Sequence, residues 1–235
     1  MGVTNQRLTE VKMHKIGGIL SGNDLQELDR LLTNGSFVDG LSSVGTRGQE
    51  IKSNLQLDAQ DPNGPLANQL VQRVLAENPE FGAYAMPFKI SPVTFSRYES
   101  GMKYGDHTDK PVNWSRHGVI RSDLSFTIFL SPPDEYEGGE LVADVLGSEE
   151  QVKFDRGDMV IYPSGLRHRV NEVTGGCRRV ALGWLQSTVR SQEQREVIQS
   201  IYNVMNDVLE SSGRTEHFNQ LAFAHANLLR MWTDV

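Results

Sequence analysis

The middle of the chain contains the run Leu124-Ser125-Phe126-Thr127-Ile128-Phe129-Leu130, which is rich in β-branched and aromatic side chains. Pro132-Pro133 follows it, so the run predicts a β-strand that ends before the two prolines. Other short runs of this kind lie at 93–98, 140–146, 159–162 and 180–185, and turns are expected at Gly138-Gly139, Gly157-Asp158 and Gly175-Gly176. Many short strands with turns at modest intervals are typical of a sandwich or jelly roll.

Helical patterns flank this strand-rich part. Ser21 is a predicted N-cap for a helix with Leu25, Leu28, Leu31 and Leu32 on one face, and a second helix is predicted over 66–77. Beyond residue 190, two long apolar stripes separated by Gly213 predict an antiparallel pair of helices. The stripes either pack on the sheet or on each other, or they form a homo-oligomer interface.

The sequence therefore predicts an α+β fold in three parts. Residues 1–80 form N-terminal helices and strands that pack on the core. Residues 81–189 form the jelly-roll core. Residues 190–235 form a C-terminal helical extension.

Composition narrows the class of protein. Acidic residues outnumber basic ones, 30 against 23, which argues against a broad nucleic-acid-binding surface. A single cysteine, Cys177, cannot form an intramolecular disulfide and fits a reducing compartment. The N-terminus does not resemble a signal peptide, and no apolar stretch is long enough for a membrane span, so we expect a cytoplasmic protein without a membrane partner.

A candidate metal site centres on Tyr104-Gly105-Asp106-His107-Thr108-Asp109. Residues two apart on a strand project from the same face, so His107 and Asp109 can point at one ion, whereas Asp106 faces away. A His-x-Asp pair is a weak signal alone, and the third ligand must come from elsewhere. His168 is favoured because it follows a turn, a strand and a break, which places it at a strand end. Two histidines and one carboxylate form the facial triad of non-haem Fe(II) oxygenases, which leaves positions open for a co-substrate and O₂.

Two arginines follow His168 in the next predicted strand. A 2-oxoglutarate molecule that chelates iron with one end needs a cation at its other carboxylate, and arginine offers a two-pronged hydrogen bond to it. Arg178 and Arg179 point to opposite faces of a strand, so only one of them can take this role. The alternative for either residue is a solvated surface arginine.

An ordered set of motifs resembles the prolyl 4-hydroxylase-like dioxygenases. It comprises Tyr98-x-x-Gly101-x-x-Tyr104-x-x-His107-x-Asp109, then Phe129-Leu130-Ser131 with residues 136–141, then Gly157-Asp158 through His168-x-Val170, and finally Arg178. Further blocks at 38–40, 51–56, 121–125 and 184–187, with the helical tail, resemble the bacterial PKHD-type hydroxylases. The resemblance covers nearly the whole chain.

This resemblance implies a double-stranded β-helix core that holds Fe(II) through His107, Asp109 and His168. It implies 2-oxoglutarate bound by Arg178, with Tyr98 and Tyr104 lining its pocket, and L-ascorbate as a reductant. The implied reaction consumes O₂ and 2-oxoglutarate, releases succinate and CO₂, and hydroxylates a C–H bond of a prolyl, lysyl or amino-acid-like substrate, peptidyl or small.

Other polar residues have open roles. Asn54, Gln56, Arg121 and Asp123 are candidate substrate-side or supporting groups, and the alternative for each is a structural hydrogen bond. Residues 110–119 are a candidate lid over the substrate or an ordinary surface loop.

Three other functions compete with the dioxygenase. A cupin-like jelly-roll metalloprotein typically uses more histidines and needs no arginine for a dicarboxylate, so Arg178 separates it from a dioxygenase. A non-catalytic module that kept the barrel predicts the loss of a ligand, yet all three are present. A serine hydrolase is disfavoured because the chain has no Gly-x-Ser-x-Gly elbow.

Overall fold

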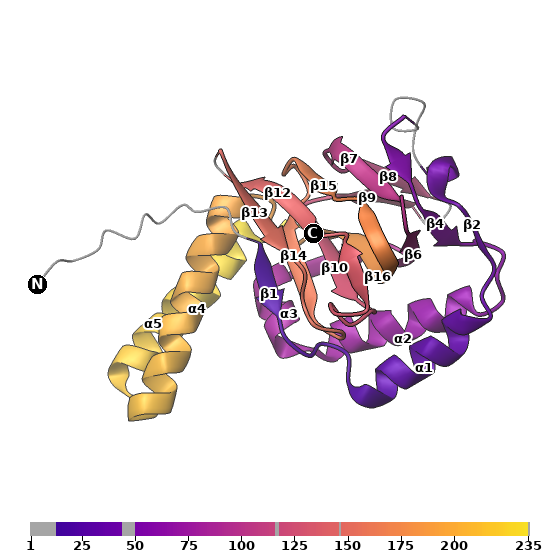
Figure 1. The fold of residues 1–235 in the computed structure, drawn as a ribbon. Coiled ribbons are helices and arrows are strands. Elements are labelled where there is room, and N and C mark those ends of the chain that lie inside the picture. The colour runs from indigo at the N-terminus through magenta and orange to yellow at the C-terminus, as the bar shows by residue number, and fades with distance from the viewer. Residues whose placement is uncertain (1–12, 44–49, 116–117, 146, 235) are drawn as a thin grey trace, which may run out of the picture.

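The computed structural model describes residues 13–43, 50–115, 118–145 and 147–234. The helices are α1 (Gly22–Thr33), α2 (Gly64–Glu77), α3 (Pro79–Ala85), α4 (Gln192–Ser212) and α5 (Glu216–Trp232), and a short 3-10 helix, η1, spans Gly40–Ser43. Figure 1 shows α1 and α2 side by side below the strands, while α4 and α5 project away from them as a hairpin.

The central strand of the larger sheet is β16 (Val173–Ser187), the longest of the described strands. The order of the sheet is β1 (His14–Ile16), β14 (Met159–Pro163), β10 (Leu124–Phe129), β16, β6 (Thr94–Glu99), β4 (Leu55–Leu57) and β2 (Phe37–Asp39). Two further strands, β5 (Pro87–Ile90) and β11 (Tyr136–Gly138), pair with β16.

The smaller sheet has the order β13 (Ser148–Val152), β12 (Leu141–Val145), β15 (His168–Val170), β7 (Lys103–His107) and β3 (Lys52–Ser53). A separate hairpin joins β8 (Val112–Ser115) to β9 (Gly118–Arg121). Every pairing among the described strands is antiparallel. The predicted α+β jelly roll is confirmed, and strands from the N-terminal part belong to both of its sheets.

The N-terminal helices begin as their sequences predict. Ser21 and Asp24 form a capping box at the start of α1, each side chain accepting the other's backbone N–H. A helix not predicted from the sequence, α3, follows directly after α2. Proline is tolerated in the first helical turn, where its missing N–H has no partner, and the Asn78 side chain accepts from the Phe81 amide. Asn78-Pro79 therefore ends one helix and starts the next.

Two apolar clusters divide the core. One packs Leu28, Leu31, Val71 and Leu75 of α1 and α2 against the larger sheet. The other lies between the sheets and includes Tyr98, Phe129, Val160, Tyr162 and Val180. Because the second cluster does not fill the barrel completely, a cavity remains between the sheets.

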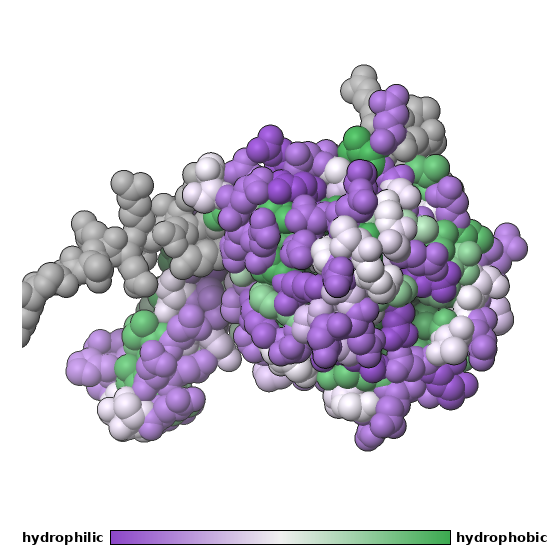
Figure 2. Space-filling view, viewed as in Figure 1, coloured by the Kyte–Doolittle hydropathy of each residue, from purple (hydrophilic) through white to green (hydrophobic). Residues whose placement is uncertain are grey.

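The C-terminal helices form the predicted pair. They pack on each other, and α4 also contacts α3. Ile198 and Phe218 are buried, but Val197, Val204, Leu209, Phe223 and Met231 are exposed. Figure 2 shows green apolar patches between purple polar ones on this hairpin. In the described part of the chain, no helix combines the length and the apolar character needed to cross a membrane.

The expectation of a turn at Gly175-Gly176 is wrong. Both glycines lie inside β16, where Gly176 pairs with Tyr136 of β11. Gly176 has a φ of +73°, and a Cβ there would lie 2.1 Å from the backbone oxygen of Glu135. The glycine therefore permits the close approach of two strands, a requirement that a sequence pattern does not distinguish from a turn.

Replacing this glycine tests the close approach. Gly176→Ala should lower the free energy of unfolding by more than Gly213→Ala, with a difference above about 1 kcal/mol. Gly213 is the matched control because its φ is +72° and nothing lies within 4 Å of the added Cβ. Urea unfolding followed by circular dichroism measures both, and equal losses would show that the strands do not require this contact.

Candidate functional site

A cavity of about 220 Å³ lies between the two sheets. His107, Asp109 and His168 line it together with Tyr98, Tyr104 and Arg178. These six residues were singled out in the sequence as metal ligands or as 2-oxoglutarate contacts. The fold brings all six to one place, although they are spread over 81 positions of the chain, from Tyr98 to Arg178.

The three predicted metal ligands converge because of strand pairing. His107 ends β7, His168 begins β15, and the two residues are direct partners in the antiparallel ladder. Asp109 follows just beyond β7. One ligand atom from each residue lies within 4.8 Å of the other two, and His168 Nε2 is 3.8 Å from Asp109 Oδ2. This spacing suits three ligands on one face of a single ion.

Both imidazoles are oriented by backbone carbonyls. His107 Nδ1 lies 2.8 Å from the Gly105 oxygen, and His168 Nδ1 lies 2.9 Å from the Leu166 oxygen. A carbonyl can only accept, so each Nδ1 carries the proton and each Nε2 offers its lone pair. This is the tautomer that binds a metal through Nε2.

Electrostatics keep His107 in its neutral form. Burial, followed by the neighbouring His168, lowers the pKa of His107 to about 4. At neutral pH its ring is therefore unprotonated before any cation arrives. A neutral imidazole is the form that binds a metal, so no proton has to be displaced from His107.

A serine pair holds the carboxylate. Ser125 Oγ donates to Asp109 Oδ2 at 2.6 Å and lies 2.7 Å from Ser164 Oγ, which therefore donates to Ser125. Ser125 and Ser164 are both buried. The arrangement leaves Oδ1 of Asp109 without this restraint and fixes the direction of the carboxyl group.

Aromatic rings enclose the two histidines. Tyr104 stacks on His107 with ring centres 3.6 Å apart, and Tyr162 meets His168 edge-on at 5.2 Å. Burial raises the pKa of Tyr104 to about 12 and the pKa of Tyr162 well above its ordinary value. Both phenols are therefore neutral and add no negative charge to the site.

Arg178 is a fully buried cation that lines the cavity. It is 1% exposed, and its guanidinium lies 5.1 Å from the Tyr98 ring centre and 5.8 Å from that of Phe129. Within the described ranges, no carboxylate forms an ion pair with it and its Nε has no hydrogen-bond partner. A buried charge without a counter-ion is costly, so this environment fits an anionic ligand such as the far carboxylate of 2-oxoglutarate.

Arg179 is the arginine that does not line the cavity. Its side chain leaves the opposite face of β16 and pairs with Asp29 of α1 at 3.2 Å. The alternation along the strand therefore separates the two neighbouring arginines, one in the cavity and one on the outer surface.

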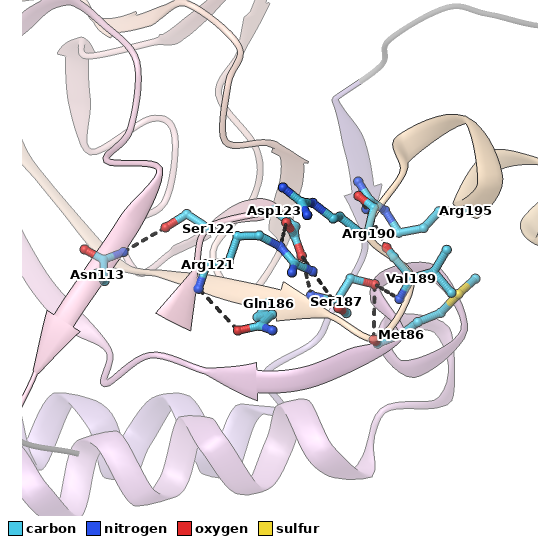
Figure 3. Close-up of polar contacts among 10 residues, drawn as sticks. All are labelled: Met86, Asn113, Arg121, Ser122, Asp123, Gln186, Ser187, Val189, Arg190 and Arg195. Carbon is cyan, nitrogen blue, oxygen red and sulfur yellow. Dashed lines mark hydrogen bonds and ion pairs between the residues drawn. The ribbon is translucent and has the colours of Figure 1, made fainter. Parts of the chain in front are cut away.

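The structure separates the four candidate substrate-side residues. Asn54 and Gln56 line the cavity. Arg121 and Asp123 do not line it and instead form a two-pronged ion pair, with Nε–Oδ1 at 2.7 Å and Nη2–Oδ2 at 2.9 Å. Figure 3 shows this pair beside Ser187, whose backbone N–H donates to Asp123 at 2.9 Å. Their contacts join the strand ends near the start of α4.

The candidate lid forms the β8–β9 hairpin. Lys110 and Asn113 line the cavity, and the Trp114 side chain is 80% exposed. Arg116 and His117, which were also expected in this segment, lie outside the described residues. Lys52 also lines the cavity, although the sequence did not indicate a role for it. Its only signal was its place in the block at 51–56 that resembles the PKHD-type hydroxylases.

Comparisons with known proteins point to one family. Residues 93–186 match the family model of the 2OG-Fe(II) oxygenase superfamily. A PKHD-type hydroxylase of Synechococcus sp. (strain JA-2-3B'a(2-13)) is 36% identical over 224 residues, which cover 94% of this chain and 98% of the relative. A PKHD-type hydroxylase of Crocosphaera subtropica is 40% identical over 219 residues, covering 93% and 98%.

A solved structure supports the fold. An oxidoreductase of the 2OG-Fe(II) oxygenase family from Burkholderia pseudomallei superposes with a TM-score of 0.56 at 15% identity, covering 73% of this chain and 84% of that one. The relatives match along nearly their whole length and carry the family name. The chain belongs to the PKHD-type hydroxylases, Fe(II)- and 2-oxoglutarate-dependent dioxygenases of the 2OG-Fe(II) oxygenase superfamily.

Proposed function

We propose that this dioxygenase hydroxylates a C–H bond of a prolyl, lysyl or amino-acid-like substrate in the cavity between its two sheets. The observation that carries this proposal is that His107, Asp109 and His168 converge in the same cavity as the buried Arg178, which has no carboxylate partner among the described residues. The cupin-like alternative does not account for a buried arginine that pairs with no carboxylate of the described residues.

Each cavity residue has a role in this proposal. The Nε2 atoms of His107 and His168 and the Asp109 carboxylate hold Fe(II), and Arg178 holds the far carboxylate of 2-oxoglutarate beside the neutral Tyr98. When bound, Fe(II) supplies the O₂ chemistry that couples loss of CO₂ from 2-oxoglutarate, giving succinate, to hydroxylation of the substrate. Tyr104 and Tyr162 exclude water around the ligands and orient the imidazole rings.

Other expectations remain predictions. L-Ascorbate as a reductant rests on the family resemblance. A cytoplasmic location rests on the sequence patterns described above, of which the single cysteine is one. Asn54 and Gln56 stay candidates for substrate contact because they line the cavity. Arg121 and Asp123 would act on the substrate only indirectly, through the strand ends that they hold together.

We also propose that two copies of the chain associate through the α4–α5 hairpin. Phe223 is 73% exposed and Met231 is 72% exposed, and both belong to α5. The hairpin projects from the body of the protein (Figure 1). Burying these side chains against a second copy would remove apolar surface from water.

The first test is an anaerobic titration of the Fe(II)-loaded protein with 2-oxoglutarate. We expect a visible charge-transfer band from the iron–keto-acid chelate. Arg178→Gln should need at least about tenfold more 2-oxoglutarate to reach it, because a charged hydrogen bond to the buried carboxylate is lost. Arg179→Gln is the matched control and should titrate like the parent protein. A band that never appears in iron-loaded parent protein would refute the proposed co-substrate, and equal titrations would move the anchor away from Arg178.

The serine pair makes a separate prediction about metal affinity. Ser125→Ala should weaken Fe(II) binding by about 10- to 100-fold, because Asp109 loses the hydrogen bond that orients it. Asp109→Ala should abolish binding in the same equilibrium dialysis. Ser131→Ala, which removes a buried serine bonded to Cys177 and Arg179 instead, is the control. Unchanged affinity in Ser125→Ala would show that Asp109 needs no such support.

The oligomer prediction is tested by sedimentation. The parent protein should sediment as a dimer, and Phe223→Glu should shift it toward the monomer. Phe88→Glu, at a 42% exposed phenylalanine of β5, should leave the dimer intact. A monomeric parent protein at micromolar concentration would contradict the proposal.

A further inference from the structure

A groove of about 390 Å³ lies near the start of α4, outside the cavity between the sheets. Three segments line it: the connection between β9 and β10, the turn between β14 and β15, and the chain around the start of α4. The residues that define it are Ser122, Asp123, Gly165, Leu166, Arg190 and Arg195. None of the residues that line the groove also lines the cavity of the metal ligands, so the two are separate sites.

The groove and the cavity are nevertheless neighbours. Asn113, which lines the cavity, donates from Nδ2 to the Ser122 hydroxyl of the groove at 2.8 Å. Leu166 lines the groove, and its backbone oxygen is the acceptor that orients His168. A ligand in the groove would therefore lie against segments that support the metal site, without entering the cavity.

The carboxylate of the groove already has a cationic partner. Asp123 is the one acid among the described residues that lines the groove. Its two oxygens accept from Arg121 at 2.7 and 2.9 Å, and Oδ2 also accepts from the Ser187 N–H at 2.9 Å. The Asp123 side chain is only 8% exposed, so salt screens this pair little. Arg121 therefore balances the charge of Asp123 before any further cation is counted.

Two further arginines, Arg190 and Arg195, line the groove beside this pair (Figure 3). Arg195 is 6% exposed, and its Nη1 donates to the backbone oxygens of Val189 and Arg190 at 2.8 and 2.9 Å. Arg190 is exposed. In the part of the chain that the structure describes, neither guanidinium forms an ion pair, and that of Arg190 forms no hydrogen bond. The groove therefore has two positive charges that no lining carboxylate balances.

The other acids near the start of α4, Glu193, Glu196 and Asp234, do not line the groove. Burial lowers the pKa of Arg195, whereas Asp123, Glu196 and Glu193 raise it. Arginine stays protonated at any ordinary pH, so the groove keeps its positive charge.

The rest of the lining suits a phosphate group on an organic molecule. Ser122 Oγ accepts from Asn113, so its own O–H can donate to a ligand. Gln192, in the first turn of α4, lines the groove, and the N-terminal end of a helix carries a partial positive charge. Pro163 and Leu166 add apolar surface to the same groove.

We propose that this groove binds a phosphate group through Arg190, Arg195 and the Ser122 hydroxyl. Two guanidinium groups match the charge of a phosphate monoester, about −1.5 to −2 at neutral pH, and arginine binds phosphate through two-pronged hydrogen bonds. A carboxylate carries a single charge and would balance only one of the two arginines. The site is additional to the iron and 2-oxoglutarate sites and does not depend on the reaction proposed for them.

The test is a calorimetric titration with inorganic phosphate and with phenyl phosphate, at constant ionic strength. The anaerobic protein is first loaded with Fe(II) and 2-oxoglutarate, so that Arg178 is occupied and neither probe binds there. The parent protein should bind phosphate in at least one of these forms. Arg190→Gln should weaken this binding by at least about tenfold, because a charged hydrogen bond is lost. Arg214→Gln is the matched control, because Arg214 is an exposed arginine beyond the opposite end of α4.

The two probes also separate the sources of the phosphate. Tighter binding of phenyl phosphate would assign the groove to a phosphate carried by an organic molecule, and equal or weaker binding would assign it to free phosphate. Benzoate should bind more weakly than the tighter of the two phosphates, because it carries one charge.

Three results would each overturn the inference: neither phosphate binds at millimolar concentration, Arg190→Gln binds as tightly as the parent protein, or benzoate binds as tightly as the better phosphate. The charge-transfer titration with 2-oxoglutarate should be unchanged in Arg190→Gln. This control shows that the variant is folded and keeps the outcome for the groove distinct from the outcome for the iron site.

Discussion

The antiparallel pairing of β7 with β15 is the constraint on which the site depends. It places His107 directly opposite His168, and the short step past the end of β7 brings Asp109 to the same point. Both strands lie inside the smaller sheet, with β3 beside β7 and β12 beside β15. The ligands are therefore held by a hydrogen-bonded ladder, which positions side chains more precisely than a loop does.

The other cavity residues favour the binding of a cation by these three side chains and of an anion by Arg178. Backbone carbonyls select the histidine tautomer, burial keeps His107 neutral, and Ser125 fixes Asp109. On the opposite sheet, Arg178 has aromatic rings around it in place of a counter-ion. Buried charges and polar groups without partners destabilise an isolated fold, so a buried Arg178 without a counter-ion among the described residues is the feature expected of a binding site for an anion.

The other parts of the chain contribute to the structure in different ways. Helices α1 and α2 cover the larger sheet, and the segment between them supplies Lys52, Asn54 and Gln56 to the cavity wall. The Arg121–Asp123 pair ties the β9–β10 connection to the end of β16, near the start of α4 (Figure 3). The α4–α5 hairpin leaves the body of the protein and carries exposed apolar side chains that the core does not use.

Local patterns were enough to predict the jelly roll, the capped first helix, the C-terminal pair and the grouping of His107 with Asp109. These features follow from strand alternation, capping chemistry and helical periodicity, which act over a few residues. The order of the motifs also indicated the family, and the family resemblance implied roles for His168 and Arg178. Tertiary structure alone decided which side chains meet across the sheets. Alternation separated Arg178 from Arg179, but only the packing of α1 showed that Asp29 receives the second. Position 176 needs a glycine because the Glu135 backbone passes close to it. Ser125 donates to Asp109, Lys52 lines the cavity, and Arg121 pairs with Asp123. Each of these outcomes depends on a contact between distant segments, and a one-dimensional pattern contains no distance across the fold.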